Sequence, residues 1–262
     1  MELIICIKQV PDTAARIKIA ASQKSIDLAD VELVVSPFDE YAVEEALRIK
    51  EAKGGKTTVI TFGAERAGQA LRQCLAMGID DAVHVLFEEF ETSDSWATAN
   101  VLASVIKTMP YDLILFGKQG VGTDNVQVPA MVAELLNLPQ ALVLTKFELI
   151  EEKKALAYSE TEGGIAVHEI PLPAVISTEK GMNEPRYPTL KGIMAAKKKP
   201  IKQLTLTDCG FTPAQVGESG SKVLFSKLSI PPARPEGKVL TGEPKDVVTQ
   251  LVNLLHNEAK VI

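Results

Sequence analysis

The segment Gly117–Val128 has the residue types and spacing of a phosphate-binding loop. Its glycines allow backbone N–H groups to approach a ligand closely, and its short polar side chains are those of Thr123, Asp124, Asn125 and Gln127. We expect a helix to begin at about Gln127, so a phosphate would meet free amides and the positive end of that helix. The spacing is neither that of a Walker loop nor Gly-x-Gly-x-x-Gly, and an ordinary strand–helix loop remains the alternative.

A second chemically distinctive segment spans residues 182–200. Between Lys180 and Lys202 there are seven basic residues and one acidic residue, Glu184, although the net charge of the chain is -6. Tyr187 and Leu190 lie among prolines, which fix φ and break helices, so we expect a stiff loop that leaves the core. A charged collar around an apolar tip suits a docking site, although most lysine runs are only solvated surface.

The sequence contains no recognisable catalytic constellation. It has no Gly-x-Ser-x-Gly elbow, no His-Glu-x-x-His motif and no cysteine close to a histidine. The three histidines lie far apart, which argues against a metal site, and the aromatic residues are too scattered for a base-stacking face that would bind nucleic acid. We therefore expect a protein that is not an enzyme, in which a cofactor supplies any reactivity.

The composition is that of an ordinary globular protein. The 262 residues are 46% apolar and 24% charged, which suits one large domain or one domain with an appendage. No apolar run reaches the ~20 residues that cross a bilayer. Three cysteines without paired spacing favour a reducing compartment. Because a strand-like run follows Met1 with no leader, we expect a bacterial cytoplasm, with the mitochondrial matrix as the alternative.

Strands and helices alternate through the first half of the chain. Apolar runs predict four strands, at Leu3–Val10, Thr57–Phe62, Ala82–Leu86 and Leu113–Gly117. Helices are predicted from Pro37 onward and over Arg66–Met77, Ser95–Met109 and Gln127–Leu136. At the first helix, Ser36 is expected to be the cap and Asp39 the acid of a capping box. This alternation predicts an α/β fold with a doubly wound, mostly parallel, Rossmann-like nucleotide-binding sheet.

The pattern changes after Pro139. Shorter strands are predicted at Ala141–Ile150, Lys154–Ser159, Ile165–Ile170 and Pro173–Ser177. We expect them to extend the sheet or to form a small antiparallel addition. From about Thr205 the chain reads as an extended arm that ends in an amphipathic helix, Pro244–Ala259. The expected organisation is an α/β domain over residues 1–204 and an arm over residues 205–262.

Several blocks of this sequence resemble the signatures of one family. They are Lys8–Asp12, Ser36–Ala46, Leu75–Gly78, Asn183–Leu190 (Asn-Glu-Pro-Arg-Tyr-Pro-Thr-Leu) and Ile193–Pro200. Through them the chain resembles, over essentially its whole length, the β (smaller) subunit of electron transfer flavoproteins. The resemblance implies a heterodimer with a larger α subunit that holds FAD. It also implies an electron carrier that connects acyl-CoA and related dehydrogenases of fatty acid oxidation to a membrane quinone reductase.

The resemblance further implies that this subunit holds a structural AMP. The matching positions are Cys6, Ser36, Pro37, Phe38, Asp39, Phe62, Gly117, Gly120, Val121, Thr123, Asp124, Asn125, Val126, Gln127 and Val128. Thr13 and Phe38 match positions that approach the flavin of the partner. Dehydrogenases are expected to dock on segment 182–200, with Leu190 as the anchor. The expected docking residues are Glu184, Arg186, Tyr187, Leu190, Ile193, Met194, Lys197, Lys198 and Lys199.

Two other interpretations stay open. A subset of the family binds a second FAD in place of AMP and bifurcates electrons with NADH. Gln127 and Val128 fit its loop, whereas Gly122 and Pro129 depart from it, so AMP is favoured. The loop Gly117–Val128 also differs from that of many AMP-binding members of the family, whose loop contains more acidic residues. The second alternative is a free-standing AMP or ATP sensor, against which the basic segment and the long arm argue.

Overall fold

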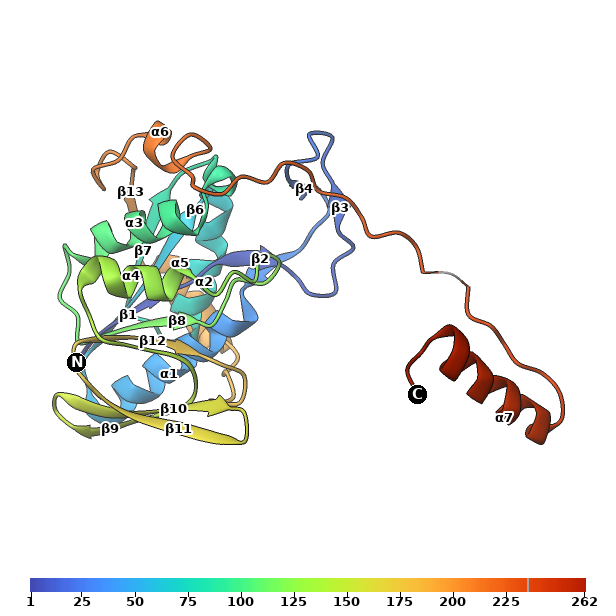
Figure 1. Ribbon diagram of the computed structural model, residues 1–262. Coiled ribbons are helices and arrows are strands. Elements are labelled where there is room, and N and C mark those ends of the chain that lie inside the picture. Colours follow the sequence, from blue (N-terminus) through green and yellow to red (C-terminus); the bar gives the residue numbers. More distant parts are fainter. Residues whose placement is uncertain (235) are drawn as a thin grey trace. The chain divides into compact units, whose positions relative to one another are not determined.

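The computed structural model describes residues 1–234 and 236–262 (Figure 1). These residues form two compact units, Met1–Leu228 and Ser229–Ile262. Among the described residues, no helix has the length and apolar character needed to cross a membrane.

The first unit is built on a nine-stranded sheet. Its strands are β1 (Glu2–Cys6), β6 (Lys56–Gly63), β7 (Asp81–Leu86), β8 (Leu113–Gly117), β9 (Gln140–Glu151), β10 (Lys154–Thr161), β11 (Gly164–Pro171), β12 (Ala174–Thr178) and β13 (Lys202–Leu204). They follow the order β11-β10-β9-β12-β8-β1-β6-β7-β13. In this order, all neighbouring strands from β9 through β12, β8, β1, β6 and β7 to β13 pair in parallel. At the other edge, β10 pairs antiparallel with β9, and β11 pairs antiparallel with β10. The predicted α/β fold with a mostly parallel sheet is confirmed.

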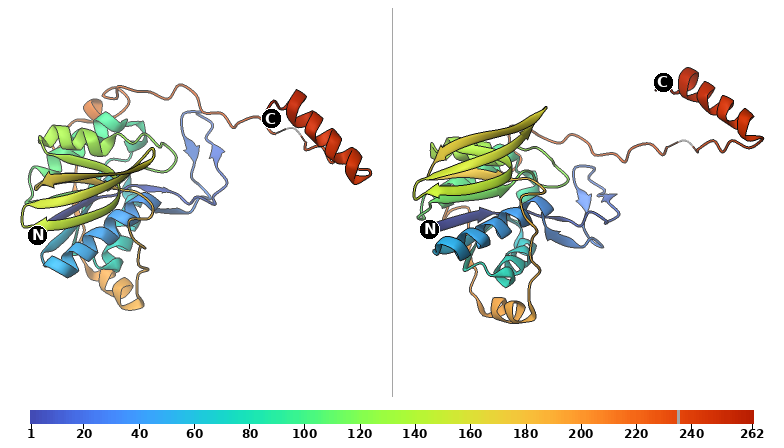
Figure 2. Two further views of the ribbon diagram at one scale, coloured as in Figure 1. Left: turned by 60° about the horizontal axis from the view of Figure 1, so that its bottom comes forward. Right: turned by 90° about the horizontal axis from the view of Figure 1, so that it is seen from below.

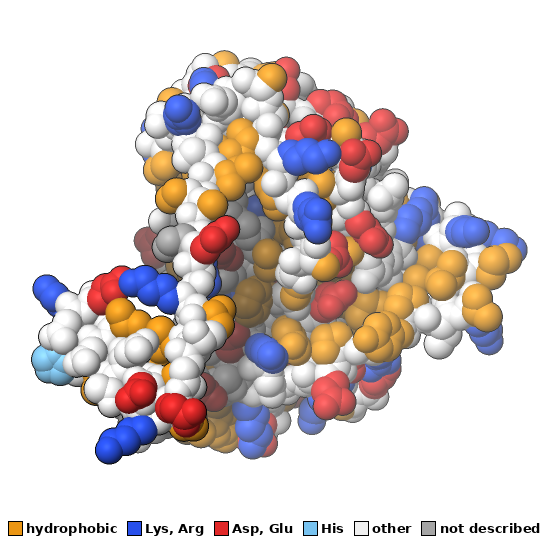
Figure 3. Space-filling view, turned by 90° about the vertical axis from the view of Figure 1, so that its right-hand side faces the viewer, with side chains coloured by type: hydrophobic (Ala, Val, Ile, Leu, Met, Phe, Trp, Pro, Cys, Tyr) orange, Lys and Arg blue, Asp and Glu red, His pale blue; other side chains and the backbone are white. Residues whose placement is uncertain are grey.

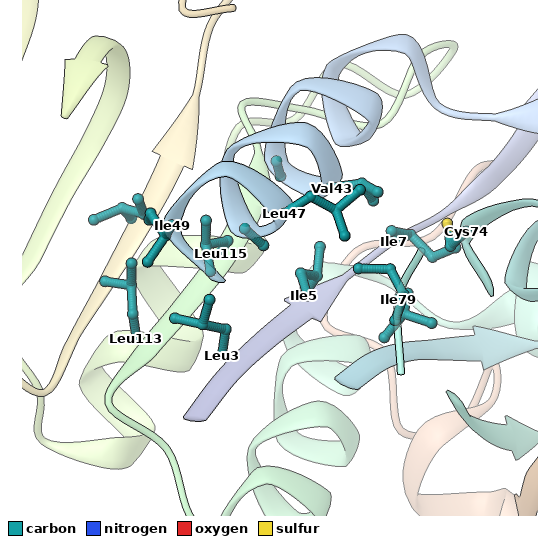
Figure 4. Packing of buried hydrophobic residues seen from close by; sticks show 14 of the residues in the cluster. Leu3, Ile5, Ile7, Val43, Leu47, Ile49, Cys74, Ile79, Leu113 and Leu115 are labelled. Atoms are coloured by element: carbon teal, nitrogen blue, oxygen red, sulfur yellow. The ribbon is translucent and has the colours of Figure 1, made fainter. Parts of the chain in front are cut away.

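Helices cover both faces of this sheet. Helices α1 (Pro37–Lys53), α2 (Gly68–Met77) and α5 (Leu190–Lys198) share one core cluster, and α3 (Ser95–Ile106), α4 (Val128–Leu136) and α6 (Pro213–Val216) share the other. Alternate residues of a strand point to opposite faces. Leu3 and Ile5 of β1 accordingly face Val43 and Leu47 of α1 (Figure 4), whereas Ile4 belongs to the cluster with α3. Burial of these branched side chains explains why the apolar runs form central strands.

The first predicted strand, Leu3–Val10, is wrong in its extent. β1 ends at Cys6, and a separate strand β2 (Gln9–Pro11) pairs with β5 (Leu33–Val35) outside the central sheet. The chain leaves the sheet at Lys8 because its N–H donates to the Asp39 carboxylate instead of a strand neighbour. Between β2 and β5, the hairpin of β3 (Lys18–Ile19) and β4 (Ile26–Asp27) extends away from the sheet (Figure 1).

The expectation of a stiff loop over residues 182–200 is correct only for its first part. Residues 183–189 form no helix or strand, but α5 follows, and the side chain of Thr189 caps it by accepting the N–H of Gly192 at 3.0 Å. The reason is local: the prolines stand at 185 and 188, before the cap, and none interrupts residues 190–198.

Residues 205–228 belong to the α/β unit, so the arm begins later than the expected boundary at residue 205. Leu206 and Val216 are buried in the cluster with α3, and the N–H groups of Lys222 and Val223 donate to the Asp94 carboxylate. These contacts hold the chain against the unit. The second unit consists of extended chain and α7 (Pro244–Asn253), which continues as a π-helical stretch at Leu254–Glu258, so the predicted terminal helix is confirmed.

Candidate functional site

The carboxyl ends of β1 and β8 form the topological switch point of the sheet. The two strands are parallel neighbours, with Cys6 opposite Phe116. From β1 the chain builds β6 and β7 on one side, and then returns to build β8 and β12 on the other. Open α/β sheets bind ligands at such a point, just beyond the carboxyl ends of the strands.

Asp39 joins these two strand ends to the first turn of α1. Its carboxylate accepts the N–H of Lys8 at 2.7 Å and the N–H of Gly117 at 3.0 Å. Burial raises the pKa of Asp39 to about 7, although both N–H groups and the nearby Lys8 ammonium act in the opposite direction. A Cβ atom at Gly117 would lie 2.4 Å from Asp39 Oδ1, so only glycine allows this approach.

The predicted capping box at Ser36 is therefore wrong. Ser36 makes no side-chain cap hydrogen bond, and its hydroxyl donates to the carbonyl of Gln119 at 3.3 Å. The Asp39 carboxylate instead satisfies two strand-end amides that would otherwise lack acceptors in a buried position. Pro37 does occupy the first turn of α1, as predicted.

The loop after β8 has the donor set of a phosphate site. The N–H groups of Thr123 and Asp124 both donate to the carbonyl of Gly120, at 3.3 and 3.0 Å, and turn the chain. Asp124 and Val126 adopt positive φ angles of 50° and 55°. This conformation costs conformational energy at Val126, whose side chain is β-branched. Within the described part of the chain, the N–H groups of residues 125–127 donate to no protein acceptor, and α4 begins immediately after them. These amides and the N-terminus of α4 fit a phosphate group.

Lys8 is a site residue that our sequence analysis missed. Its ammonium donates to Thr123 Oγ1 at 3.3 Å, and its side chain lies against Gly120, where a Cβ would be 2.7 Å from Lys8 Cδ. Burial lowers the pKa of Lys8, while Asp39 and Asp124 raise it. The available signal was the position of Lys8, two residues after the end of β1. Lys118, by contrast, pairs with Glu179.

The remaining predicted nucleotide positions fall into two groups. Cys6 and Phe62 are buried, and Phe62 stacks on Phe87 with ring centroids 6.0 Å apart, so these side chains face the core. Residues 119–128 lie at the carboxyl edge and are exposed or half-buried, and Asn125 donates to Ser95 Oγ at the start of α3 at 3.1 Å. Thr13 lies in an exposed turn beyond β2, whereas Phe38 lies in the first turn of α1.

The second candidate site is a projecting surface on α5. We name the exposed residues Glu184, Tyr187, Leu190, Lys191, Ile193, Met194, Lys197 and Lys198 the α5 surface. Tyr187 and Leu190 are 92% and 84% exposed, and Met194 is 60% exposed. Figure 2 shows α5, in light orange, projecting from the α/β unit, and Figure 3 shows hydrophobic side chains beside Lys and Arg on the projection at its right edge.

Two of the predicted docking residues point back toward the unit. Arg186 pairs with Glu44 and Glu51 of α1, and Lys199 donates through Nζ to the carbonyl of Ile79 at 2.6 Å. The structure thus brings together the apolar residues and two lysines of the predicted set on one surface, and it separates Arg186 and Lys199 from them.

Comparison with known proteins gives a consistent result. Residues 25–209 match the family model described as "Electron transfer flavoprotein domain". Three bacterial relatives share the name "Electron transfer flavoprotein subunit beta". That of Bacillus subtilis (strain 168) is 38% identical over 100% of both chains, and that of Syntrophomonas wolfei is 38% identical over 100% of this chain and 98% of its own. That of Megasphaera elsdenii is 38% identical over 93% of this chain and 92% of its own. Because the family model matches residues 25–209 and the first two relatives match over the full length of the chain, this chain belongs to the electron transfer flavoprotein family, as a subunit of the beta type.

Proposed function

We propose that this electron-transfer subunit works in a heterodimer with an α subunit that holds FAD. The pair receives electrons from acyl-CoA and related dehydrogenases and passes them to a quinone reductase, in the cytoplasm of a bacterium. Membership of the family and the names of the relatives support the electron-carrier part, in which this chain is not an enzyme. The bound flavin supplies the redox chemistry, and this chain supplies the surface on which the dehydrogenase docks.

The exposure of the α5 surface is the observation that carries this proposal. Tyr187, Leu190, Ile193 and Met194 are all exposed within one short segment, and such a cluster of exposed apolar side chains is typical of an interaction site. A carrier must bind tightly enough to exchange electrons and must leave quickly, which suits a small interface with one apolar anchor. The exposed lysines of the α5 surface would attract an acidic partner and raise the rate of encounter.

We also propose that the loop at the switch point binds AMP. Its phosphate would accept hydrogen bonds from the amides of residues 125–127, with Lys8 as the nearby positive charge. Ser36, Phe38 and Asp39 would hold the loop and the strand ends in place from α1. The nucleotide then has a structural role, because it fills and stabilises the edge where β1, β8 and α4 meet.

The docking proposal predicts the effect of Leu190→Ala. Loss of a central apolar anchor costs about 2 kcal/mol or more, so we expect kcat/KM for reduction by the dehydrogenase to fall by at least about 30-fold. FAD content and heterodimer formation should not change. Ile150→Ala, which trims another exposed apolar side chain (45% exposed) at the end of β9, is the matched control. Wild-type kinetics for Leu190→Ala would show that the α5 surface is not the docking site.

The cofactor proposal predicts the content of the purified heterodimer. We expect one FAD and one AMP per heterodimer after co-expression of both subunits and release of the bound nucleotides by acid. Two FAD molecules and no AMP would replace our proposal with the bifurcating type. A chain that stays monomeric, binds AMP or ATP and forms no heterodimer would instead be a nucleotide sensor.

A further inference from the structure

Two carboxylates on one side of α1 contact the start of the projecting segment. Glu44 and Glu51 are seven residues apart, which places them on the same side of the helix. The side chain of Glu44 is only 4% exposed, and that of Glu51 is 58% exposed. A buried carboxylate needs a charged partner to compensate for lost solvation, and α1 supplies only part of this through Arg48.

Arg186 provides the rest from a position 142 residues away in sequence. Its Nε donates to Glu44 Oε2 at 2.8 Å and its Nη2 to Glu44 Oε1 at 3.0 Å, while the backbone N–H donates to Oε2 at 3.2 Å. Nη1 and Nη2 also donate to Glu51. Burial pushes the pKa of Glu44 upward, but these hydrogen bonds outweigh it and hold the pKa below its usual value. The planar guanidinium fork therefore fixes both the position and the orientation of Arg186.

Further contacts fix the two ends of the projection. Before Arg186, the amide of Asn183 donates to the carbonyl of Tyr41 at 3.0 Å and to Glu45 at 3.1 Å. At the end of α5, the guanidinium of Arg72 on α2 donates to the carbonyls of Ala196 and Lys199. The exposed residues Tyr187 and Leu190 lie between these attachments, one and four residues after Arg186.

We propose that Arg186, held by Glu44 and Glu51, is a positioning residue that presents Leu190 to the dehydrogenase in one fixed orientation. This inference rests on the docking function proposed above. A loose segment would have to be ordered at the moment of binding, and the loss of chain entropy would weaken the complex. We call the ion pairs of Arg186 with Glu44 and Glu51 the clamp. Because the clamp already orders residues 183–189 in the free protein, the small interface with the dehydrogenase keeps its affinity.

The test uses the FAD-loaded heterodimer with the double variant Glu44→Gln/Glu51→Gln. This variant removes the charged acceptors, leaves no buried carboxylate unpaired at position 44, and changes no residue of the α5 surface. We expect KM for the dehydrogenase to rise about fivefold to tenfold while kcat changes by less than about twofold, since transfer within the complex is unaffected. Hydrogen exchange of the amides in residues 184–195 should become faster. Glu169→Gln, which breaks an exposed ion pair with Lys154, is the control. It should change neither KM for the dehydrogenase nor the hydrogen exchange of residues 184–195.

A second variant separates the clamp from direct contact. Arg186→Lys keeps the charge but loses the fork, so we expect a similar rise in KM and faster exchange. If Arg186 contacts the dehydrogenase directly, Arg186→Lys will raise KM while Glu44→Gln/Glu51→Gln leaves KM unchanged, and the clamp is then refuted. Faster exchange with an unchanged KM in the double variant refutes it too. Leu190→Ala, run in the same assay, shows separately whether the docking site itself is correct.

Discussion

Asp39 is the residue on which the carboxyl edge of the central sheet depends. It stands in the first turn of α1 and accepts N–H groups from two neighbouring strands, so one carboxylate ties three elements together. Its burial is nearly complete, with 5% of the residue exposed. A carboxylate in such a place favours its neutral form, because little solvent is left to stabilise the charge.

This environment predicts an unusual dependence of stability on pH. The pKa of Asp39 rises from its ordinary value of 3.8 to about 7 in the folded protein. A raised folded pKa contributes stability that is fully present below pH 4 and is lost as the pH rises to about 7. Asp39→Asn cannot ionise, so the free energy of unfolding of wild type should fall relative to this variant, by on the order of 4 kcal/mol between pH 4 and pH 8.

The measurement is urea unfolding of both proteins at several pH values. Comparing the two curves removes contributions from other groups, such as His84, whose pKa is lowered by burial and which acts in the opposite direction. Parallel curves would mean that Asp39 is ionised in the folded protein throughout. The variant should also be less stable than wild type at pH 4, because an amide group offers only one acceptor to two N–H donors.

At the scale of elements, the start of α3 holds the last part of the α/β unit. Asp94 caps α3 by accepting the N–H of Ala97 at 2.9 Å through Oδ1. Its Oδ2 accepts the N–H groups of Lys222 and Val223 at 2.6 and 3.0 Å. Ser221 adds a hydroxyl contact to the carbonyl of Thr92 at 2.9 Å. The Asp94 carboxylate thus caps α3 and also attaches residues 222 and 223 to the α/β unit.

Asp94→Ala should therefore have two effects. We expect a loss of about 1–2 kcal/mol in the free energy of unfolding, because the cap is removed. We also expect faster proteolytic cleavage within residues 217–228, because the attachment is lost as well. Asp94→Asn keeps an acceptor for Ala97 but has an NH2 group in place of the second oxygen, so its stability should lie close to that of wild type while residues 217–228 are still cleaved faster. If neither variant is cleaved faster than wild type, the attachment to residues 222 and 223 does not matter.

At the scale of the whole molecule, the two units differ in how they bury apolar residues. The α/β unit has a continuous core on each face of its sheet. In the second unit, Val248, Leu251 and Val252 of α7 are 58%, 46% and 48% exposed. A helix with such an apolar stripe gains little stability by itself, and for this reason we propose that the arm, residues 229–262, binds the α subunit.

Truncation after Leu228 tests this difference between the units. The chain Met1–Leu228 should keep the circular dichroism spectrum and the melting temperature of the α/β unit, since it retains both core clusters. Its association with the α subunit should weaken by at least about 100-fold, which corresponds to about 3 kcal/mol. Co-purification with a tagged α subunit measures this. Undiminished association would place the subunit contact on the α/β unit.

Much of this fold could be predicted from local patterns alone. The apolar runs at residues 113–117 and 57–62 become buried strands, and Gly78 ends α2 with a φ of 125°. The terminal helix was likewise readable from its apolar stripe. These features depend on side-chain periodicity and backbone geometry within a few residues, so they do not require knowledge of what lies nearby in space.

The candidate sites could be predicted only in outline. The glycine-rich loop and the exposed residues around Leu190 were recognisable, but the role of Asp39 was assigned to a local capping box. Thr189, one residue before α5, was not recognised as its cap, because the prolines dominated the interpretation of the segment. For Asp39, a plausible local partner concealed the distant partners that the structure uses.

The amino-acid sequence by itself determined most of the order of strands and helices in the central sheet, the family, and the composition of the two candidate sites. Only the tertiary structure decided which side chains act together. Asp39 meets Gly117 across 78 residues, and Arg186 meets Glu44 across 142. Contacts at such separations depend on how the strands pair and how the helices cover the sheet. One sequence is compatible with many pairings of its charged residues. Burial selects the few pairings that leave no carboxylate or amide without a hydrogen-bond partner.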